Sequence, residues 1–325
     1  MTTSARTRIG TLAGGLAAVG LLSGCGLGTA AGYSPSGELA GPVEGIDLEG
    51  VSIDVGSKDF TEQIILGEMA VILMQSAGAD VQNLTNIPGS NAVREAMLQG
   101  ALDFQWEYTG TAWLTYLGHE EPIIDEWEQY EAVRDQDREH GMVWLEPSTV
   151  DNTYAMAVTQ ETAEQGITSL SDIAELDEAE QTYCVEAEFA ARNDGFEPMI
   201  EHYDLPVPEG DAQRTMDSGA IYQATADGAC TMGLVFATDG RIPALDLVVL
   251  EDDEDFFPRY NLSAVFGEEI LEENPELEDL IMPLTERLDN DTMAGLNAQV
   301  DVDGEEPADV AWEFLLEEGY VTEGQ

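Results

Sequence analysis

The pattern of apolar and polar residues over 51–78 predicts a strand that leads into a helix. Apolar and polar residues alternate over 51–55, and an apolar-rich run then continues to Met74. Asp59 and Glu62 stand at the spacing of a capping box before this run, and Gly78 follows it as a stop. We therefore expect a strand, a turn and a helix in that order.

The same alternation continues along both halves of the chain. The pattern predicts strands at 81–84, 101–106 and 229–236, and helices at 92–99 and 213–226. Gly100 and Gly228 end these two helices, and the chain beyond Gly267 is mostly helical until about Leu316. Strand–helix–strand order is typical of parallel sheets, and its repetition indicates an α/β protein with two lobes built alike.

The first residues have the pattern of an export signal. Two arginines precede an apolar run over 9–22, whose 14 residues fall short of the roughly 20 that a membrane span needs. The run ends in Leu-Ser-Gly-Cys at Cys25, which resembles a bacterial lipobox. We expect 1–24 to be a lipoprotein signal peptide and Cys25 to carry lipid. The Gly-, Ala-, Pro- and Ser-rich stretch 25–49 is then a flexible tether.

The composition is strongly acidic. The chain carries 66 Asp and Glu against 11 Lys and Arg, a formal charge of −55, which disfavours binding to nucleic acid or anionic lipid. Such a surface is typical of proteins that stay soluble in concentrated salt, where the Debye length falls to about 3 Å. Lys58 is the single lysine of the sequence.

Two cysteines remain once Cys25 is assigned to lipid. Outside the cell such a pair forms a disulfide more often than it stays reduced. We therefore expect Cys184 and Cys230 to be joined. A redox-active pair is the alternative, but the sequence contains no Cys-x-x-Cys motif.

Catalytic and metal-binding patterns are not found. The three histidines (His119, His140 and His202) lack metal-ligand spacing, and the mature chain has no Gly-x-Ser-x-Gly, P-loop or Rossmann fingerprint. The acidic stretches 251–255 and 301–304 do not complete an EF-hand. The sequence thus predicts no enzyme activity, no metal and no cofactor.

Aromatic and cationic residues recur at strand ends and loop starts, where open α/β sheets bind ligands. They are Lys58, Tyr108, Tyr154, Arg192, Phe236 and Tyr260. Tyrosine rings present π-faces to a cation that cannot donate hydrogen bonds, such as a trimethylammonium group. Lys58 and Arg192 have the chemistry to clamp a carboxylate. Taken singly, each aromatic is more often a core or rim residue.

Several motifs occur in order between residues 51 and 319. They are Gly56-Ser-Lys-Asp-Phe-Thr-Glu-Gln, Trp106-Glu-Tyr-Thr-Gly-Thr-Ala, Asn152-Thr-Tyr-Ala, Glu188-Phe-Ala-Ala-Arg-Asn-Asp-Gly, Thr238-Asp-Gly-Arg-Ile and Leu296-Asn. Together they resemble the substrate-binding proteins of osmoprotectant ABC importers, of the ProX and OpuC type, which take glycine betaine, choline and related quaternary amines. The resemblance implies a class II periplasmic-binding-protein fold. Lobe 1 would comprise 50–155 and 256–325, and lobe 2 would comprise 156–255.

The resemblance also implies roles for the site residues. Lys58 and Arg192 would face a ligand carboxylate with Asn152 nearby, and the cage would be formed by Tyr108, Tyr154 and Tyr260. Two positions depart from the family pattern. Asn152 stands where some members have an acid, with Asp151 beside it, and Phe236-Ala237 stands where a tyrosine is common.

The leading hypothesis is a lipid-anchored, monomeric receptor on the outer face of the membrane. It would close its lobes on a glycine betaine- or choline-type osmolyte and deliver it to an ABC permease and its ATPase subunit. Two alternatives stay open at this point. One is a class II binding protein for another solute, such as an amino acid or ectoine, and the other is a surface protein with no role in transport.

Overall fold

The strand and helix expected over 51–78 are present in the computed structural model, which describes residues 34–323. Strand β2 (Ser52–Lys58) is buried along its second half. Helix α1 (Thr61–Ser76) is apolar on nearly all sides, and a helix of this kind is stable only when it is buried. It ends before Gly78, whose φ of 96° lies in the left-handed region that favours glycine.

The first sheet has five strands in the order β3–β2–β4–β11–β5. Strand β2 is parallel to β3 and β4, whereas β11 is antiparallel to both of its neighbours. The other bounds are β3 (Asp80–Ile87), β4 (Phe104–Tyr108), β5 (Met142–Trp144) and β11 (Leu262–Gly267). Because β11 lies far along the sequence, the half of the protein that holds this sheet is built from two separate stretches of chain.

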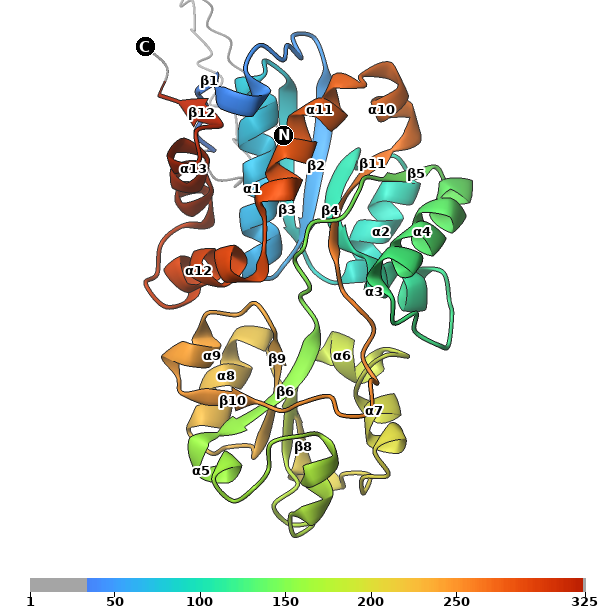
Figure 1. Cartoon of the computed structure of the whole chain (residues 1–325), viewed down its shortest axis with the longest axis vertical. Coiled ribbons are helices and arrows are strands. Elements are labelled where there is room, and N and C mark those ends of the chain that lie inside the picture. Colours follow the sequence, from blue (N-terminus) through green and yellow to red (C-terminus); the bar gives the residue numbers. More distant parts are fainter. Residues whose placement is uncertain (1–33, 324–325) are drawn as a thin grey trace, which may run out of the picture. The chain divides into compact units, whose positions relative to one another are not determined.

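Helices cover both faces of the first sheet. In Figure 1, α1, α12 and α13 gather on one side of it, and α2 and α4 on the other. The bounds are α2 (Ser90–Leu98), α3 (Thr109–Thr111), α4 (Glu126–Asp137), α10 (Glu268–Glu273), α11 (Glu276–Arg287), α12 (Asn290–Asp301) and α13 (Pro307–Glu317). Short turns of helix stand at η1 (Gly41–Val43), η2 (Ala112–Tyr116) and η3 (Arg138–His140).

The second sheet also has five strands, in the order β10–β6–β9–β7–β8. Strand β7 is parallel to β8 and β9, and β6 is antiparallel to β9 and β10. The strands are β6 (Tyr154–Thr159), β7 (Tyr183–Val185), β8 (Gln213–Thr215), β9 (Met232–Phe236) and β10 (Leu247–Val249). The helices are α5 (Gln160–Ala163), η4 (Ser171–Glu175), α6 (Ala187–Ala191), α7 (Phe196–His202), η5 (Gly210–Ala212), α8 (Ser218–Ala226) and α9 (Arg241–Ala244).

Two chain segments connect the sheets, one between β5 and β6 and the other between β10 and β11 (Figure 1). They pair where they pass each other. Asp151 and Asn261 form an isolated antiparallel bridge, and the Asn152 amide donates to the Tyr260 carbonyl at 3.2 Å. The α/β class with two sheet-centred halves is therefore confirmed.

Several local expectations are wrong. Both sheets are mixed rather than purely parallel, because β6, β10 and β11 run against their neighbours. The start of the helix expected at 213–226 is strand β8. The capping box is absent, since α1 has Phe60 as its N-cap and no side chain caps it.

The two ends of the described region meet. Strand β1 (Glu38–Leu39) pairs antiparallel with β12 (Val321–Thr322). The expected signal peptide and Cys25 lie outside the described residues. Within residues 34–323, none of the helices has the length and apolar character required to span a bilayer.

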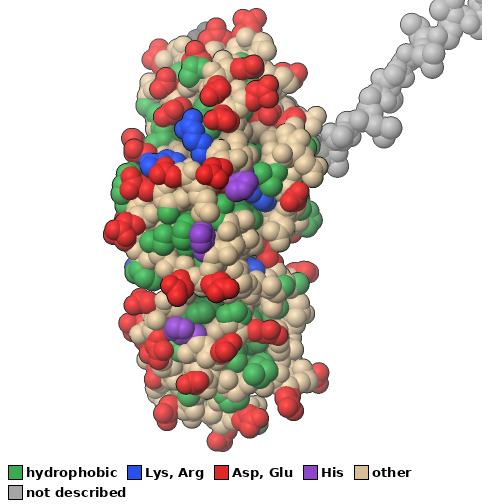
Figure 2. Space-filling model, turned by 90° about the vertical axis from the view of Figure 1, so that its right-hand side faces the viewer, with side chains coloured by type: hydrophobic (Ala, Val, Ile, Leu, Met, Phe, Trp, Pro, Cys, Tyr) green, Lys and Arg blue, Asp and Glu red, His purple; other side chains and the backbone are tan. Residues whose placement is uncertain are grey.

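Acidic side chains dominate the surface. Figure 2 shows Asp and Glu spread over the whole visible face, with few Lys or Arg among them. The surface has few basic side chains partly because three of them, Lys58, Arg94 and Arg192, are buried in the interior. Each of these three forms an ion pair with a buried carboxylate, as a buried charge requires.

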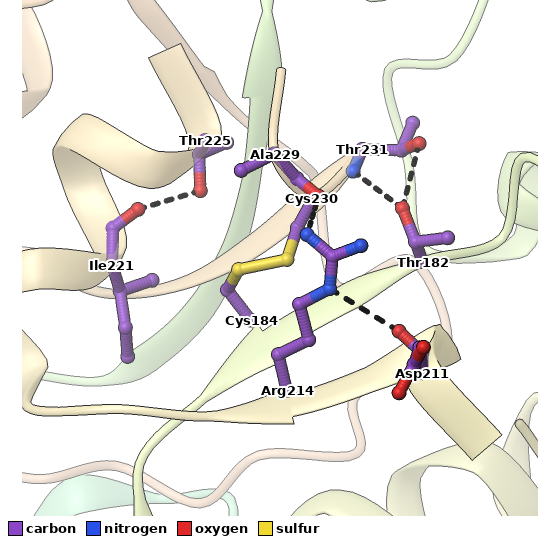
Figure 3. The surroundings of a disulfide bond; sticks show 9 residues. All are labelled: Thr182, Cys184, Asp211, Arg214, Ile221, Thr225, Ala229, Cys230 and Thr231. Carbon is purple, nitrogen blue, oxygen red and sulfur yellow. Dashed lines mark hydrogen bonds between the residues drawn. A yellow bond between two sulfur atoms is a disulfide. The ribbon is translucent and has the colours of Figure 1, made fainter. Parts of the chain in front are cut away.

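A disulfide joins Cys184 and Cys230 in the second sheet (Figure 3). Cys184 lies on β7, and Cys230 precedes the neighbouring parallel strand β9, which brings their Cα atoms to 5.7 Å. Beside it, the Arg214 guanidinium donates to the Ala229 carbonyl at 2.6 Å. The disulfide therefore links β7 to the residues directly before β9, its parallel neighbour in the sheet.

Replacing both cysteines by serine should lower the free energy of unfolding by about 4 kcal/mol, the chain-entropy value for a closed loop of 46 residues. Urea titration of the wild type and the variant measures this difference. Reductant should destabilise the wild type and leave the variant unchanged. Equal midpoints for the oxidised wild type and the variant would contradict a stabilising role for the disulfide.

Candidate ligand-binding site

A cavity of about 720 Å³ opens where strands of both sheets end. Lys58, Tyr108 and Phe236 are the last residues of β2, β4 and β9, and Glu186 directly follows β7. The lining residues are Lys58, Asp59, Phe60, Pro88, Gly89, Ser90, Tyr108, Thr111, Asn152, Tyr154, Glu186, Ala187, Glu188, Thr215, Met216, Asp217, Ser218, Phe236 and Tyr260. The site thus follows the rule that ligands of open α/β sheets bind beyond the carboxyl ends of strands.

Five aromatic rings form a continuous wall in this cavity. Phe60 stacks on Phe236 with ring centroids 5.2 Å apart, and Tyr108 lies 6.2 Å from Phe60. Tyr154 lies 5.3 Å from Phe236 and meets Tyr260 edge to face at 5.4 Å. Sequence reasoning found four of these rings but missed Phe60, which the turn before α1 carries to the same place.

Buried carboxylates fix two of the tyrosine hydroxyls. Tyr108 donates to Glu62 Oε1 at 2.7 Å, and Tyr260 donates to Asp194 Oδ2 at 2.7 Å. Burial raises the pKa of Tyr108, Tyr154 and Tyr260 well above the ordinary value. The three phenols are therefore neutral, and the rings present electron-rich faces without a charge.

Glu62 is the centre of a buried network that sequence reasoning missed. Besides Tyr108, its carboxylate accepts from Asn152 Nδ2 at 2.9 Å, from Asn297 Nδ2 at 3.1 Å and from the Thr238 hydroxyl. Burial raises the pKa of Glu62, and the four donors partly oppose that shift. The donors come from β4, from the segment before β6, from the residues after β9 and from α12, so one carboxylate connects both halves of the protein.

Lys58 lines the cavity but is already paired. Its ammonium lies 2.5 Å from Glu107 Oε1 and 4.9 Å from the centroid of the Tyr108 ring. The other Glu107 oxygen accepts from the Tyr116 hydroxyl at 2.6 Å. The one lysine of the chain thus contributes to the wall of the site with its charge balanced by a neighbour.

Arg192 does not line the cavity. Its guanidinium forms a two-point ion pair with Asp194, and its Cζ lies 5.3 Å from the centroid of the Tyr154 ring. Since Asp194 also accepts from Tyr260, the pair holds two rings of the wall from behind. A contact of Arg192 with a ligand carboxylate stays a prediction.

Asp151 and Asn152, in the segment before β6, face different parts of the structure. Asn152 lines the cavity, and its Oδ1 accepts from the Thr238 amide at 3.3 Å. Asp151 faces the other connecting segment, where it accepts from the Tyr260 amide at 2.8 Å and from Arg259 at 3.2 Å. Of the two neighbours, Asn152 lines the cavity and Asp151 does not.

Acidic groups line the rest of the cavity: Asp59, Glu186, Glu188 and Asp217. Glu188 reaches across to the first half, where its Oε2 accepts from the Ser90 amide at 3.1 Å. Burial, together with the charges of Glu188 and Asp59, raises the pKa of Glu186 to about 7. A deep cavity with an aromatic wall and unbalanced negative charge is suited to a small organic cation.

Two sheet-centred halves, two connecting segments and a cavity between strand ends are the architecture of a two-lobed solute-binding protein. Residues 51–317 match the family described as the substrate binding domain of the ABC-type glycine betaine transport system. The chain belongs to this family, whose members are transport proteins and not enzymes.

Two known relatives match this chain along most of their own length. The glycine-betaine-binding protein of Pseudomonas aeruginosa PAO1 is 40% identical over 283 residues, which cover 84% of this chain and 90% of that protein. The carnitine transport binding protein OpuCC of Listeria monocytogenes is 33% identical over 275 residues, or 83% of this chain and 87% of that protein. A solved structure described as a glycine betaine/carnitine/choline ABC transporter has 29% identity and a TM-score of 0.68, and the match covers 82% of this chain and 98% of that chain.

We expect Glu62→Gln to weaken ligand binding by about tenfold, because an amide nitrogen cannot accept from the donors that Glu62 now satisfies. Titration calorimetry with glycine betaine and choline measures the loss, which should be similar for both ligands. Glu68→Gln is the matched control, since Glu68 is also buried on α1 but bonds to Ser34 and Asn83 away from the cavity. Equal affinities in the two variants would exclude the positioning role of Glu62.

Proposed function

We propose that the protein captures quaternary ammonium osmolytes of the glycine betaine and choline type and delivers them to an ABC permease. The observation that carries this proposal is the wall of five aromatic rings, three of them neutral phenols, around one cavity. The names of two relatives, a glycine-betaine-binding protein and a carnitine transport binding protein, support the same class of ligand.

The aromatic wall can supply the binding free energy that such a ligand requires. A trimethylammonium group cannot donate hydrogen bonds, so it is held by ring faces at about 0.5 to 2 kcal/mol each, according to how well it is desolvated. Several such contacts, together with burial of the methyl groups, are sufficient for the roughly 8 kcal/mol of a micromolar complex. In this proposal Lys58, Tyr108, Asn152, Tyr154, Phe236 and Tyr260 contact the ligand, and Arg192 acts through Tyr154 and Tyr260.

Closure of the two halves on the ligand is part of the proposal. The halves correspond to 50–155 with 256–325 and to 156–255, and the paired segments around Asp151 and Asn261 are the hinge. Both halves already share polar contacts through Glu62 with Thr238 and through Glu188 with Ser90. A ligand that touches both walls favours the closed state by its differential affinity.

The proposal extends to the setting in which the protein works. The lipobox at Cys25 supports a lipid anchor on the outer face of the membrane. The tether in this proposal is shorter than the expected 25–49, because residues 38–39 and 41–43 belong to β1 and η1 and Val43 and Leu48 are buried. The charge of −55 supports a habitat of high salt, where importing an osmolyte is useful. We further propose that the receptor acts as a monomer.

We expect a thermal-shift and calorimetric panel of glycine betaine, choline, carnitine, proline and ectoine, run at high salt, to detect binding of the trimethylammonium compounds alone. Tyr154→Leu should weaken this binding at least about tenfold, because leucine keeps apolar bulk but lacks a π-face. Phe266→Leu is the packing control, since Phe266 is a buried ring of β11 that does not line the cavity. Binding of proline or ectoine without any trimethylammonium compound would overturn the proposal.

A further inference from the structure

Glu186 stands out among the charged groups of the cavity because its carboxylate is unpaired in the part of the chain that the structure describes. It directly follows β7, lines the cavity and is largely shielded from solvent. Within residues 34–323, its carboxylate neither accepts a hydrogen bond nor forms an ion pair; only burial and more distant charges act on it. A carboxylate held in this way keeps its full capacity to accept a hydrogen bond from a ligand.

The other acids of the cavity are satisfied or solvated. Glu188 accepts from the Ser90 amide at 3.1 Å and lies 3.4 Å from Arg192 Nη1. Asp59 is exposed and accepts from the Gly89 amide at 3.3 Å, and Asp217 is exposed to solvent. Among the acids that line the cavity, Glu186 is therefore the one that is shielded from solvent without a hydrogen bond or an ion pair in residues 34–323, and the charges of Arg192 and Lys58 offset its burial only in part.

The cations near the cavity do not balance it. Lys58 is paired with Glu107, and Arg192 is paired with Asp194. A ligand carboxylate placed in this cavity would compete with those two internal carboxylates and would be repelled by Glu186. A ligand with a positive charge and a hydroxyl group would instead supply a cation and a hydrogen-bond donor for the Glu186 carboxylate.

We infer that Glu186 is a specificity-determining residue, which makes the site prefer a hydroxyl-bearing quaternary ammonium cation over a zwitterion with a carboxylate. This inference rests on the proposed function, and it narrows the class of ligand from quaternary ammonium osmolytes in general to those that carry a hydroxyl group. The ammonium lies against the aromatic wall, and the ligand hydroxyl donates to Glu186. Choline has this chemistry, whereas glycine betaine carries an acceptor where choline carries a donor.

The acid–base behaviour of the site agrees with this assignment. Burial and the nearby acids raise the pKa of Glu186 to about 7, so the carboxylate is charged mainly above that pH. The charged groups that face it are Glu188 on α6, Asp59 and Lys58 at the end of β2, and Arg192 after α6. Choline affinity should therefore rise between pH 6 and pH 8, while glycine betaine affinity should stay level or fall.

The test measures the affinities of choline and glycine betaine by calorimetry at pH 6 and pH 8, for the wild type, Glu186→Gln and Glu197→Gln. Glu197→Gln is the control, because it removes the same charge from an exposed position on α7. We expect the wild type to prefer choline at pH 8, and Glu186→Gln to reduce that preference by roughly tenfold to hundredfold and to remove its pH dependence. The control should behave as the wild type does.

A wild type that prefers glycine betaine, or a choline preference that Glu186→Gln leaves unchanged, would overturn the inference while the proposed function stands. A wild type that binds neither compound would overturn the proposed function itself. If Glu186→Gln lowers the melting temperature of the free protein too far for titration, the pH dependence of the wild type decides: choline affinity that does not rise from pH 6 to pH 8 contradicts the assignment.

Discussion

The site depends on one constraint. Tyr108, Tyr154 and Tyr260 must present their ring faces to the cavity while their hydroxyl groups are buried in the protein. A buried hydroxyl without a partner is costly, so a tyrosine whose hydroxyl lies in the protein interior is stabilised by an acceptor there. Glu62 supplies one for Tyr108, and Asp194 supplies one for Tyr260. These acceptors are charged, so they in turn need donors or cations, and the network that results reaches both halves of the protein.

The two acceptors are compensated in different ways. Asp194 is neutralised by Arg192, whose guanidinium also faces the Tyr154 ring. Within residues 34–323, Glu62 is not paired with a cation: burial raises its pKa, and four neutral donors oppose that shift only in part. The first arrangement holds one wall of the cavity, and the second places the connecting segment at Asn152 against the wall at Tyr108. Ring geometry and the relation between the halves therefore rest on the same buried polar groups.

The fold and the cavity wall were largely predictable from sequence, because both follow local rules. Helix and strand periods indicated the α/β class, and the rule about strand ends selected Lys58, Tyr108, Tyr154, Phe236 and Tyr260, all of which line the cavity. The direction of β6, β10 and β11 was not predictable, since it depends on which strands meet after long connections. Glu62 fitted a local capping pattern, yet its partner Asn297 lies 235 residues away.

The ion pairs of the two cations were not predicted from the sequence either. Lys58 pairs with Glu107 and Arg192 with Asp194, and spacing along the chain does not show which cations are already neutralised.

The central claim is that the aromatic wall holds a quaternary ammonium group, and a crystal structure of the protein with choline tests it most directly. The account predicts the ligand nitrogen within about 6 Å of the ring centroids of Tyr108, Tyr154, Phe236 and Tyr260, the range of a cation–π contact. Choline bound away from these rings, or a cavity that stays empty at saturating choline and glycine betaine, would contradict the account.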